Sequence, residues 1–389
     1  MDFRFTPEQE QFREQIRGFL AQHLSDELRA EIAAGGHTPG PLGKQFLRLL
    51  GEHGWLGVGW PREYGGQGRS MIEQTIFYHE LDLHDVHFGN LTITSLAMTL
   101  IKLASEEQKR EYLPRILRGE LEICLGYTEP GAGSDLAGIT TRAELDGTDY
   151  LITGQKVFTT GAHYASHCWL LARSEPTAPR HKGLSVFIFP LDTPGVTIHP
   201  IYTMEGIRTN EVFLDQVRVP ASCMIGAPGS GFYTVAMALD FERAFMGKYT
   251  KLGRDFEALV QCCKQINADG RSLFEDPLIR DRLVRLHIDI ERLRLLCLKS
   301  AWMIDEGKVP TAEASAQKVL ASELEQRLAD EGIQILGGYG QLERESPHTP
   351  MKGRLAQSWL ISPMLRFGGG ANEIQRDIIA QRGLGLPRA

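Results

Sequence analysis

The stretch Thr128–Asp135, which follows a short apolar run over residues 121–127, most constrains what this chain can fold into. Pro130 has no backbone N–H for a sheet ladder, and Gly131 and Gly133 favour unusual backbone angles. The stretch is therefore neither a regular helix nor a central strand. Its backbone N–H groups and small hydroxyl side chains can approach a flat or anionic group. On this segment alone, an ordinary turn between two strands is the alternative.

Residues 1–120, which precede this stretch, are predicted to form helices. Thr6-Pro7 supplies a helix cap and a proline at the first helical position, and acidic residues follow. Ser105 has Gln108 three residues later, which is the pattern of a capping box. Both patterns predict helix starts in an N-terminal helical domain.

Residues 121–228 change character. Short runs rich in β-branched and aromatic residues alternate with turn signals such as Asp146-Gly147. This spacing predicts a small middle domain of antiparallel strands, which resembles a barrel or a sandwich. The runs expected to form strands are 143–145, 150–153, 156–160, 168–172, 184–189, 197–199 and 211–219.

From residue 229 to 389 the sequence returns to helical spacing. One amphipathic segment runs from about 231 to 266, and Asp276-Pro277 opens a second. A third covers 311–336, and a fourth begins near Asn372 and ends at Gly383. Four helices of this kind predict a C-terminal four-helix bundle. We therefore expect three domains with limits at 1–120, 121–228 and 229–389.

Composition narrows the class of protein. The chain of 389 residues is 42% hydrophobic, which is ample for a sizeable core, and its formal charge of −7 argues against nucleic acid as a main partner. The N-terminus lacks the apolar segment of a secretory signal, and no apolar run approaches the roughly 18 residues of a membrane span. We expect a cytoplasmic protein with no membrane partner.

No metal site is expected. The six cysteines show no C-x-x-C spacing, and reduced thiols are the interpretation we favour. His79, His84 and His87 cluster, but at irregular spacing, and packed or solvated histidines are favoured over ligands.

The chain carries six motifs in a fixed order, namely 61–66 (PREYGG), 125–135 (LGYTEPGAGSD), 154–161 (GQKVFTTG), 213–220 (FLDQVRVP), 334–340 (QILGGYG) and 372–376 (NEIQR). In content and in order they resemble the acyl-CoA dehydrogenases, and the resemblance covers essentially the whole chain. It identifies residues 125–135 with the flavin loop of that family.

The resemblance implies an FAD-dependent enzyme that oxidises the Cα–Cβ bond of an acyl-CoA thioester. A carboxylate takes the α-proton while hydride leaves Cβ for flavin N5. The chemistry needs a carboxylate base in a dry pocket, hydrogen-bond donors to the thioester oxygen, and a flavin held against the acyl chain.

The resemblance also indicates where the base lies. Gly369 stands where many members of the family carry the catalytic glutamate. The isovaleryl-CoA and long-chain acyl-CoA dehydrogenases instead carry it in a Glu-Arg pair on the first long helix of the C-terminal bundle, which Glu242-Arg243 matches. Glu242 is therefore the candidate catalytic base, and a surface glutamate in an ion pair is the alternative. The Gly369 N–H would still donate to the thioester oxygen, and the missing side chain leaves room for a branched or bulky acyl group.

Cofactor contacts within the chain follow from the same resemblance. Leu125, Tyr127 and Thr128 would contact the isoalloxazine ring. Phe158 would stack near the ring, although ordinary strand core is its alternative, and Thr160 would give a hydroxyl to it.

Substrate contacts and contacts between subunits are implied as well. Ser134 would lie where the flavin and the CoA thioester meet, and Asp240 and Arg243 would meet the CoA or orient the base. The resemblance also implies FAD contacts, some of them between subunits, for Arg271, Gln334, Gly338 and Glu373.

Three departures from the family pattern affect the adenine half of the cofactor. Glu275 replaces the glycine of the family's Arg-x-x-Phe-Gly stretch, Pro277 occupies the position of a downstream glutamine, and Ala371 stands where threonine is common. Together these departures remove polar partners from the adenine half of the cofactor.

Contacts between subunits imply a homo-oligomer, either a dimer or a homotetramer, and a heteromer stays open. An electron-transfer flavoprotein is the expected electron acceptor. Two other functions remain alternatives: a largely non-catalytic subunit that pairs with a related chain, and an oxygen-dependent or non-redox reaction of a CoA thioester on the same fold.

Overall fold

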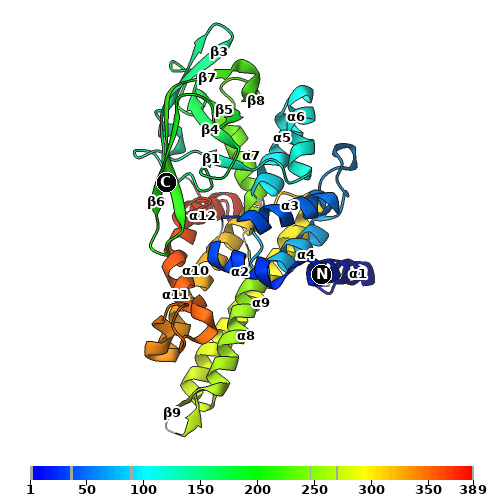
Figure 1. The fold of residues 1–389 in the computed structure, drawn as a ribbon, viewed down its shortest axis with the longest axis vertical. Coiled ribbons are helices and arrows are strands. Elements are labelled where there is room, and N and C mark those ends of the chain that lie inside the picture. The colour runs from blue at the N-terminus through cyan, green and yellow to red at the C-terminus, as the bar shows by residue number, and fades with distance from the viewer. Residues whose placement is uncertain (1–2, 36–37, 88–90, 246, 269, 388–389) are drawn as a thin grey trace. The chain divides into compact units, whose positions relative to one another are not determined.

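The computed structural model of the chain describes residues 3–35, 38–87, 91–245, 247–268 and 270–387. They form two compact units, each with its own hydrophobic core (Figure 1). The bundle unit comprises Met1–Ala21, Ser70–Val86 and Arg243–Ala389, and the sheet unit comprises Gln22–Arg69 and His87–Glu242. The two units therefore meet in the sequence within a single helix, between Glu242 and Arg243.

The α-helices are α1 (Pro7–His23), α2 (Asp26–Gly35), α3 (Pro41–Glu52), α4 (Met71–Asp82), α5 (Ala97–Leu103), α6 (Glu106–Leu117), α7 (Gly231–Ala244), α8 (Tyr249–Gln265), α9 (Pro277–Asp305), α10 (Thr311–Leu336), α11 (Arg354–Leu365) and α12 (Asn372–Ile378). Short 3₁₀ or π segments are η1 (Trp55–Gly57), η2 (Arg62–Tyr64), η3 (Thr92–Leu96), η4 (Leu136–Gly138), η5 (Ala221–Cys223), η6 (Leu273–Glu275), η7 (Gly337–Gln341), η8 (Pro350–Gly353) and η9 (Ile379–Gly383).

The strands are β1 (Ile123–Gly126), β2 (Arg142–Asp146), β3 (Asp149–Lys156), β4 (His167–Arg173), β5 (Leu184–Pro190), β6 (Val196–Tyr202), β7 (Arg208–Pro220), β8 (Met224–Ile225), β9 (Asn267–Ala268) and β10 (Arg271–Ser272). The main sheet has the order β6-β7-β3-β2-β4-β5-β8, and β1 pairs with β4.

The burial of each strand agrees with its position in the sheet. β4 and β5 are buried on both faces along nearly their whole length, as expected for apolar runs such as 184–189, and they lie inside the sheet. β6 is largely exposed and forms an edge. Most pairings are antiparallel, but β4 runs parallel to both β1 and β2, so the sheet is mixed where the chain enters it.

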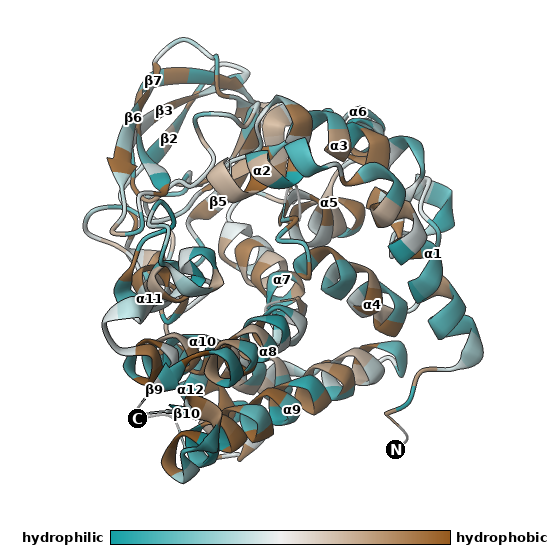
Figure 2. Cartoon of the chain, turned by 60° about the horizontal axis from the view of Figure 1, so that its bottom comes forward, coloured by the Kyte–Doolittle hydropathy of each residue, from teal (hydrophilic) through white to brown (hydrophobic). Residues whose placement is uncertain are grey.

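The core of the bundle unit lies among α8, α9, α10 and α11. Apolar residues at helical spacing supply it, among them Leu252, Leu259, Leu286, Leu293, Leu324, Leu328 and Leu355. Hydrophobic and hydrophilic residues are interspersed along α9, as amphipathic packing requires (Figure 2).

The predicted succession of a helical region, a β-sheet region and a second helical region is confirmed. Both helix starts are also confirmed. Thr6 and Gln9 exchange side-chain and backbone hydrogen bonds at the start of α1, and Ser105 and Gln108 do so at the start of α6. The domain limits at residues 120 and 228 stay predictions.

Three predictions of secondary structure were wrong. The segment 231–266 is two helices, because the chain between α7 and α8 passes close to α9 and α10: a Cβ at Gly247 would lie 2.3 Å from Cys297 Sγ. The expected strand 156–160 ends at Lys156, because Phe158 has a φ of 58° that breaks the ladder. The four helices predicted for the bundle did not include α11, whose Leu355 belongs to the core.

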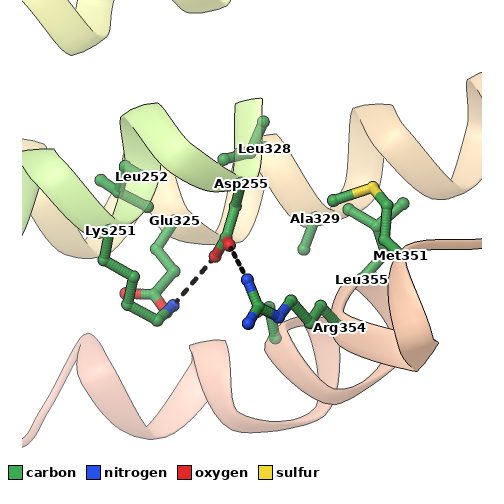
Figure 3. Close-up of a pocket in the computed structure, with 10 residues that line it drawn as sticks. Lys251, Leu252, Asp255, Glu325, Leu328, Ala329, Met351, Arg354 and Leu355 are labelled. Carbon is green, nitrogen blue, oxygen red and sulfur yellow. Dashed lines mark hydrogen bonds and ion pairs between the residues drawn. The ribbon is translucent and has the colours of Figure 1, made fainter. Parts of the chain in front are cut away.

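A network of charges surrounds a small cavity among α8, α10 and α11 in the bundle unit (Figure 3). Buried Asp255 pairs with Lys251 at 3.5 Å, with Arg254 at 3.0 Å and with Arg354 at 3.1 Å. Lys251 also pairs with Glu325 at 2.7 Å. The pKa of Lys251 is raised, since these two carboxylates outweigh the effect of burial. The network lies outside the predicted site and is structural.

The Asp255→Asn substitution should destabilise the bundle unit by about 3 kcal/mol. It removes the negative charge that Lys251, Arg254 and Arg354 share. The measurement is the thermal midpoint of unfolding. Asp281→Asn on α9, where the ion pair with Arg285 is exposed, is the matched control and should change the midpoint little. Equal midpoints for the two variants would contradict the assignment.

Candidate active site

A buried ion pair holds the start of the stretch Thr128–Asp135. Lys156 at the end of β3 is fully buried, and its Nζ lies 2.8 Å from Glu129 Oε1. The same Nζ donates to the carbonyl oxygen of Tyr127 at 3.1 Å. Lys156 thereby joins the end of β3 to the residues that follow β1.

Both oxygens of the Glu129 carboxylate accept hydrogen bonds. Its Oε2 accepts from the Thr140 N–H at 2.6 Å and from the Thr140 hydroxyl at 2.8 Å, and its Oε1 accepts from the Thr141 N–H at 2.9 Å. Burial alone would raise the pKa of Glu129, but the charge of Lys156 and these hydrogen bonds outweigh it and lower the pKa to about 2. Glu129 is therefore a structural anion and not a catalytic base.

The turn after β3 presents an aromatic ring and a hydroxyl at the surface of the sheet unit. Phe158 has a left-handed φ of 58°, and its side chain is 61% exposed. The neighbouring Val157 N–H donates to the carbonyl oxygen of Thr128 at 2.9 Å, which places the turn beside the flavin loop. Thr160 is exposed, and its hydroxyl lies 3.1 Å from that of Thr209. An unusual backbone angle combined with an exposed aromatic ring is typical of a functional site.

Glu242 lies on the inward face of α7. Val235 and Ala238 are buried, and Glu242 follows them at helical spacing of seven and four residues. The Ser95 hydroxyl donates to the carbonyl oxygen of Ala238 at 2.6 Å, which fastens this turn of α7 to the segment Thr92–Leu96.

The charge of Glu242 affects the pKa of Tyr127, a residue of the flavin loop. The hydroxyl oxygen of Tyr127 is buried, and burial raises the pKa of that hydroxyl well above its usual range. The negative charge of Glu242 raises the Tyr127 pKa further, whereas the Trp169 indole N–H opposes the shift. Glu242 therefore lies close enough to Tyr127 for its charge to affect that hydroxyl, and its side chain is only partly exposed.

The glycine loop of the bundle unit precedes α12. Gly369 and Gly370 have φ values of 66° and 101°, which glycine adopts without strain and a glutamate would not. A Cβ at Gly370 would lie 2.6 Å from the side-chain nitrogen of Gln375 and 3.8 Å from Arg243 Nη2. Arg243 therefore lies beside this loop.

A buried lysine supports both ends of the glycine loop. Lys318 Nζ donates to the Arg366 carbonyl oxygen at 2.9 Å and to Asn372 Oδ1 at 2.7 Å. Burial lowers the pKa of Lys318 to about 8, and the charge of Glu373 opposes this shift while that of Arg243 adds to it.

The other predicted residues are dispersed. Leu125 lies on β1, and Ser134 and Asp240 are exposed in the sheet unit. In the bundle unit Arg271 is exposed on β10, Gly338 lies in η7, and Glu373 is exposed on α12.

Gln334 on α10 is exposed and bonds to Arg282 and Asp330. Among the described residues no hydrogen bond joins Arg271, Gln334 and Gly338 to one another. The structure therefore leaves their assignment to cofactor contacts between subunits as a prediction.

Sequence reasoning missed the residues that support the site. Lys156 was noted only as part of a motif, because its buried partner Glu129 lies 27 residues away in the sequence. Lys318, Thr209 and Asn210 carried no signal, because their role depends on contacts with residues distant in the sequence.

Comparisons with known proteins agree with this architecture. Family models described as acyl-CoA dehydrogenase N-terminal, middle and C-terminal domains match residues 6–120, 124–217 and 229–384. The chain is 37% identical to acyl-CoA dehydrogenase FadE26 of Mycobacterium tuberculosis, over 100% of both chains.

Two solved structures are similar over 100% of this chain and of theirs. The first, described as Tcur3481-Tcur3483 steroid ACAD, has a TM-score of 0.93 and 36% identity. The second, the ChsE4-ChsE5 complex from Mycobacterium tuberculosis, has a TM-score of 0.92 and 35% identity.

The chain belongs to the acyl-CoA dehydrogenase family. It is an enzyme of the class that oxidises a CH–CH bond of an acyl-CoA, and its cofactor is FAD. The exposed ring of Phe158 and the exposed hydroxyl of Thr160 lie on the turn that Val157 joins to the Thr128 carbonyl oxygen, and an aromatic ring beside a hydroxyl is suited to a flat, polar ring system such as isoalloxazine. In the part of the chain that the structure describes, no helix is long and apolar enough to cross a membrane.

The ion pair of Glu129 should make stability depend on pH in acid. The folded-state pKa of about 2 lies below the ordinary value of 4.5, so the stabilisation is complete above pH of about 4.5 and is lost as the pH falls toward 2. Glu129→Gln should remove this dependence and, because Lys156 is left buried without its anion, cost about 3 kcal/mol at pH 7.

Thermal unfolding of the Glu129→Gln variant between pH 2 and pH 7 measures both effects. Glu144→Gln, which removes an exposed partner of Arg142, is the control and should follow the parent protein. A Glu129→Gln variant with the parent's midpoint at pH 7 would show that the pair does not stabilise the fold.

Proposed function

We propose that this enzyme removes a proton from Cα and a hydride from Cβ of an acyl-CoA thioester, with Glu242 as the catalytic base. The observation that carries the proposal is the position of Glu242 on the inward face of α7, where its charge acts on the buried hydroxyl of Tyr127. Glu242 is partly buried, and a carboxylate that loses hydration is a stronger base than one in water.

The backbone of Gly369 is proposed to polarise the thioester. Its N–H can donate to the carbonyl oxygen, because that hydrogen bond needs no side chain. Such a donor stabilises the negative charge that develops on the oxygen as the α-proton moves to the carboxylate of Glu242. Lys318, which bonds to the Arg366 carbonyl oxygen and to Asn372, keeps the glycine loop in place.

FAD, when bound, supplies the acceptor for the hydride that leaves Cβ. Phe158 and Thr160 are proposed to position the isoalloxazine ring, together with Leu125, Tyr127 and Thr128 of the flavin loop. The pair of Glu129 and Lys156 holds the loop and the turn in register with one another, since Lys156 bonds to both Glu129 and the carbonyl of Tyr127.

The substrate is proposed to carry a bulky, ring-containing acyl group. One similar structure is described as a steroid ACAD. The chain itself has glycines at 368, 369 and 370, so that this stretch of the loop adds no side chains of its own to the space beside it. A large acyl group can use this space, and a straight short chain would leave it empty.

A heteromer with a related chain is proposed as the working assembly. Two similar structures are described by pairs of chains, Tcur3481-Tcur3483 and ChsE4-ChsE5. Glu275, Pro277 and Ala371 replace residues that would give polar contacts to the adenine half of FAD. A related chain that retains those residues would restore the contacts across its interface with this one.

Substitution of the base tests the reaction. Glu242→Gln should slow bleaching of the bound flavin by a ring-containing acyl-CoA about 100- to 10,000-fold, because the α-proton then has no acceptor. The flavin spectrum before substrate addition should be unchanged. Glu257→Gln, which changes an exposed glutamate on α8, is the control and should bleach at the parent's rate. Undiminished bleaching in Glu242→Gln would remove Glu242 from this role.

The assembly is tested by purifying the chain alone and together with a second acyl-CoA dehydrogenase chain from the same source. We expect the pair to elute as one complex that binds more FAD than this chain alone. Native mass and flavin absorbance per chain are the measurements. A homotetramer with one FAD per chain would contradict the heteromer while leaving the reaction in place. A pair that stays colourless and inactive with added FAD would contradict the reaction itself.

A further inference from the structure

The start of β7 packs against the turn that presents Phe158 and Thr160. The N–H of Thr159 donates to the Asn210 carbonyl oxygen at 2.9 Å, and the Asn210 side chain donates back to the Thr159 carbonyl oxygen at 2.9 Å. Asn210 is fully buried, and Arg208 Nε donates to its Oδ1 at 2.9 Å. The peptide groups of the turn are therefore fixed by β7, although the turn itself has an unusual backbone angle at Phe158.

Thr209, the residue before Asn210, contacts the side chain of the turn. Its Oγ1 lies 3.1 Å from Thr160 Oγ1, and Thr209 is only 4% exposed. Among the described residues, the Thr160 hydroxyl is the sole hydrogen-bond partner of the Thr209 hydroxyl. A buried hydroxyl proton without a partner is unfavourable, so Thr209 is best satisfied as the donor and Thr160 as the acceptor.

The direction of this hydrogen bond has a consequence for Thr160. If its oxygen accepts from Thr209, its own proton must point elsewhere. Thr160 is exposed on the surface that also carries the Phe158 ring, so the proton is directed away from the sheet. A single donor direction at this surface is what a ring nitrogen acceptor of a flavin requires.

We propose that Thr209 is a positioning residue, which orients the Thr160 hydroxyl as a donor toward the bound flavin. This inference rests on the proposed placement of the isoalloxazine ring against the Phe158–Thr160 turn. A donor that is already oriented stabilises the electron-rich reduced flavin more than one that rotates freely. Thr209 therefore raises the reduction potential of the flavin and the rate of its reduction, without touching either the cofactor or the substrate.

The experiment compares Thr209→Val, Thr209→Ser, Thr160→Val and the double variant in the FAD-loaded enzyme, with its partner chain if one is required. Thr209→Val keeps the shape of the side chain and removes the hydroxyl. It should slow flavin reduction by saturating acyl-CoA about two- to tenfold and lower the midpoint potential of the flavin measured without substrate. Thr209→Ser should restore both values.

The double variant separates positioning from a general structural effect. If Thr209 acts through Thr160, adding Thr209→Val to Thr160→Val should change the potential and the rate no further. Thr153→Val is the matched control, because the Thr153 hydroxyl also bonds to a residue of β7, Gln216, away from the turn. It should leave the potential of the flavin unchanged.

The outcomes distinguish this inference from the proposed function. No change of potential in Thr160→Val would show that the flavin does not meet this turn, and the proposed placement of the ring would fail. A shift in Thr160→Val together with the parent's potential in Thr209→Val would overturn the role of Thr209 alone. Additive shifts in the double variant would overturn it as well.

Discussion

The ion pair between Glu129 and Lys156 is the interaction on which the candidate site depends. It joins the residues after β1, which have no regular structure of their own at this point, to the end of β3. The carboxylate receives four hydrogen bonds or ion contacts from Lys156, Thr140 and Thr141, so its charge is fully compensated in a place that water does not reach. Such a pair is stable only when complete, since either charge alone would be buried without a partner.

The bundle unit also holds an irregular segment with a buried lysine, but the partners of that lysine are of a different kind. Lys318 is also buried, but its partners are a carbonyl oxygen and an amide oxygen rather than a carboxylate. Its charge is therefore less well compensated than that of Lys156. In both units a buried lysine fixes an irregular segment that sequence patterns connect with the reaction, the flavin loop in one case and the glycine loop in the other.

Local patterns predicted what depends on local contacts. The helix start at Thr6 was predicted from a cap followed by a proline, and the start at Ser105 from a capping box, which involves residues three apart. The strands 168–172 and 184–189 were predicted from short runs of apolar, β-branched and aromatic residues between turn signals. Motif order, rather than any single motif, indicated the family.

Features that depend on distant residues were not predictable in this way. The break between α7 and α8 follows from the approach of Gly247 to Cys297 and Gln317, which lie 50 and more residues away. The early end of β3 follows from the backbone angle of Phe158, which its amino acid type disfavours and only the surrounding hydrogen bonds explain. Helix α11 was also not predicted, although its Leu355 packs in the bundle core against residues distant in the sequence.

The backbone of Phe158 has a consequence for how the cofactor is acquired. The chain's own hydrogen bonds, from Asn210 on one side and to Thr128 on the other, keep this residue in a conformation that an isolated peptide would rarely visit. The free-energy cost of that conformation is therefore offset when the sheet unit folds, and binding of the flavin does not have to offset it. On the proposed placement of the ring, this part of the flavin site is already formed before the cofactor binds, so binding there requires little rearrangement of the turn.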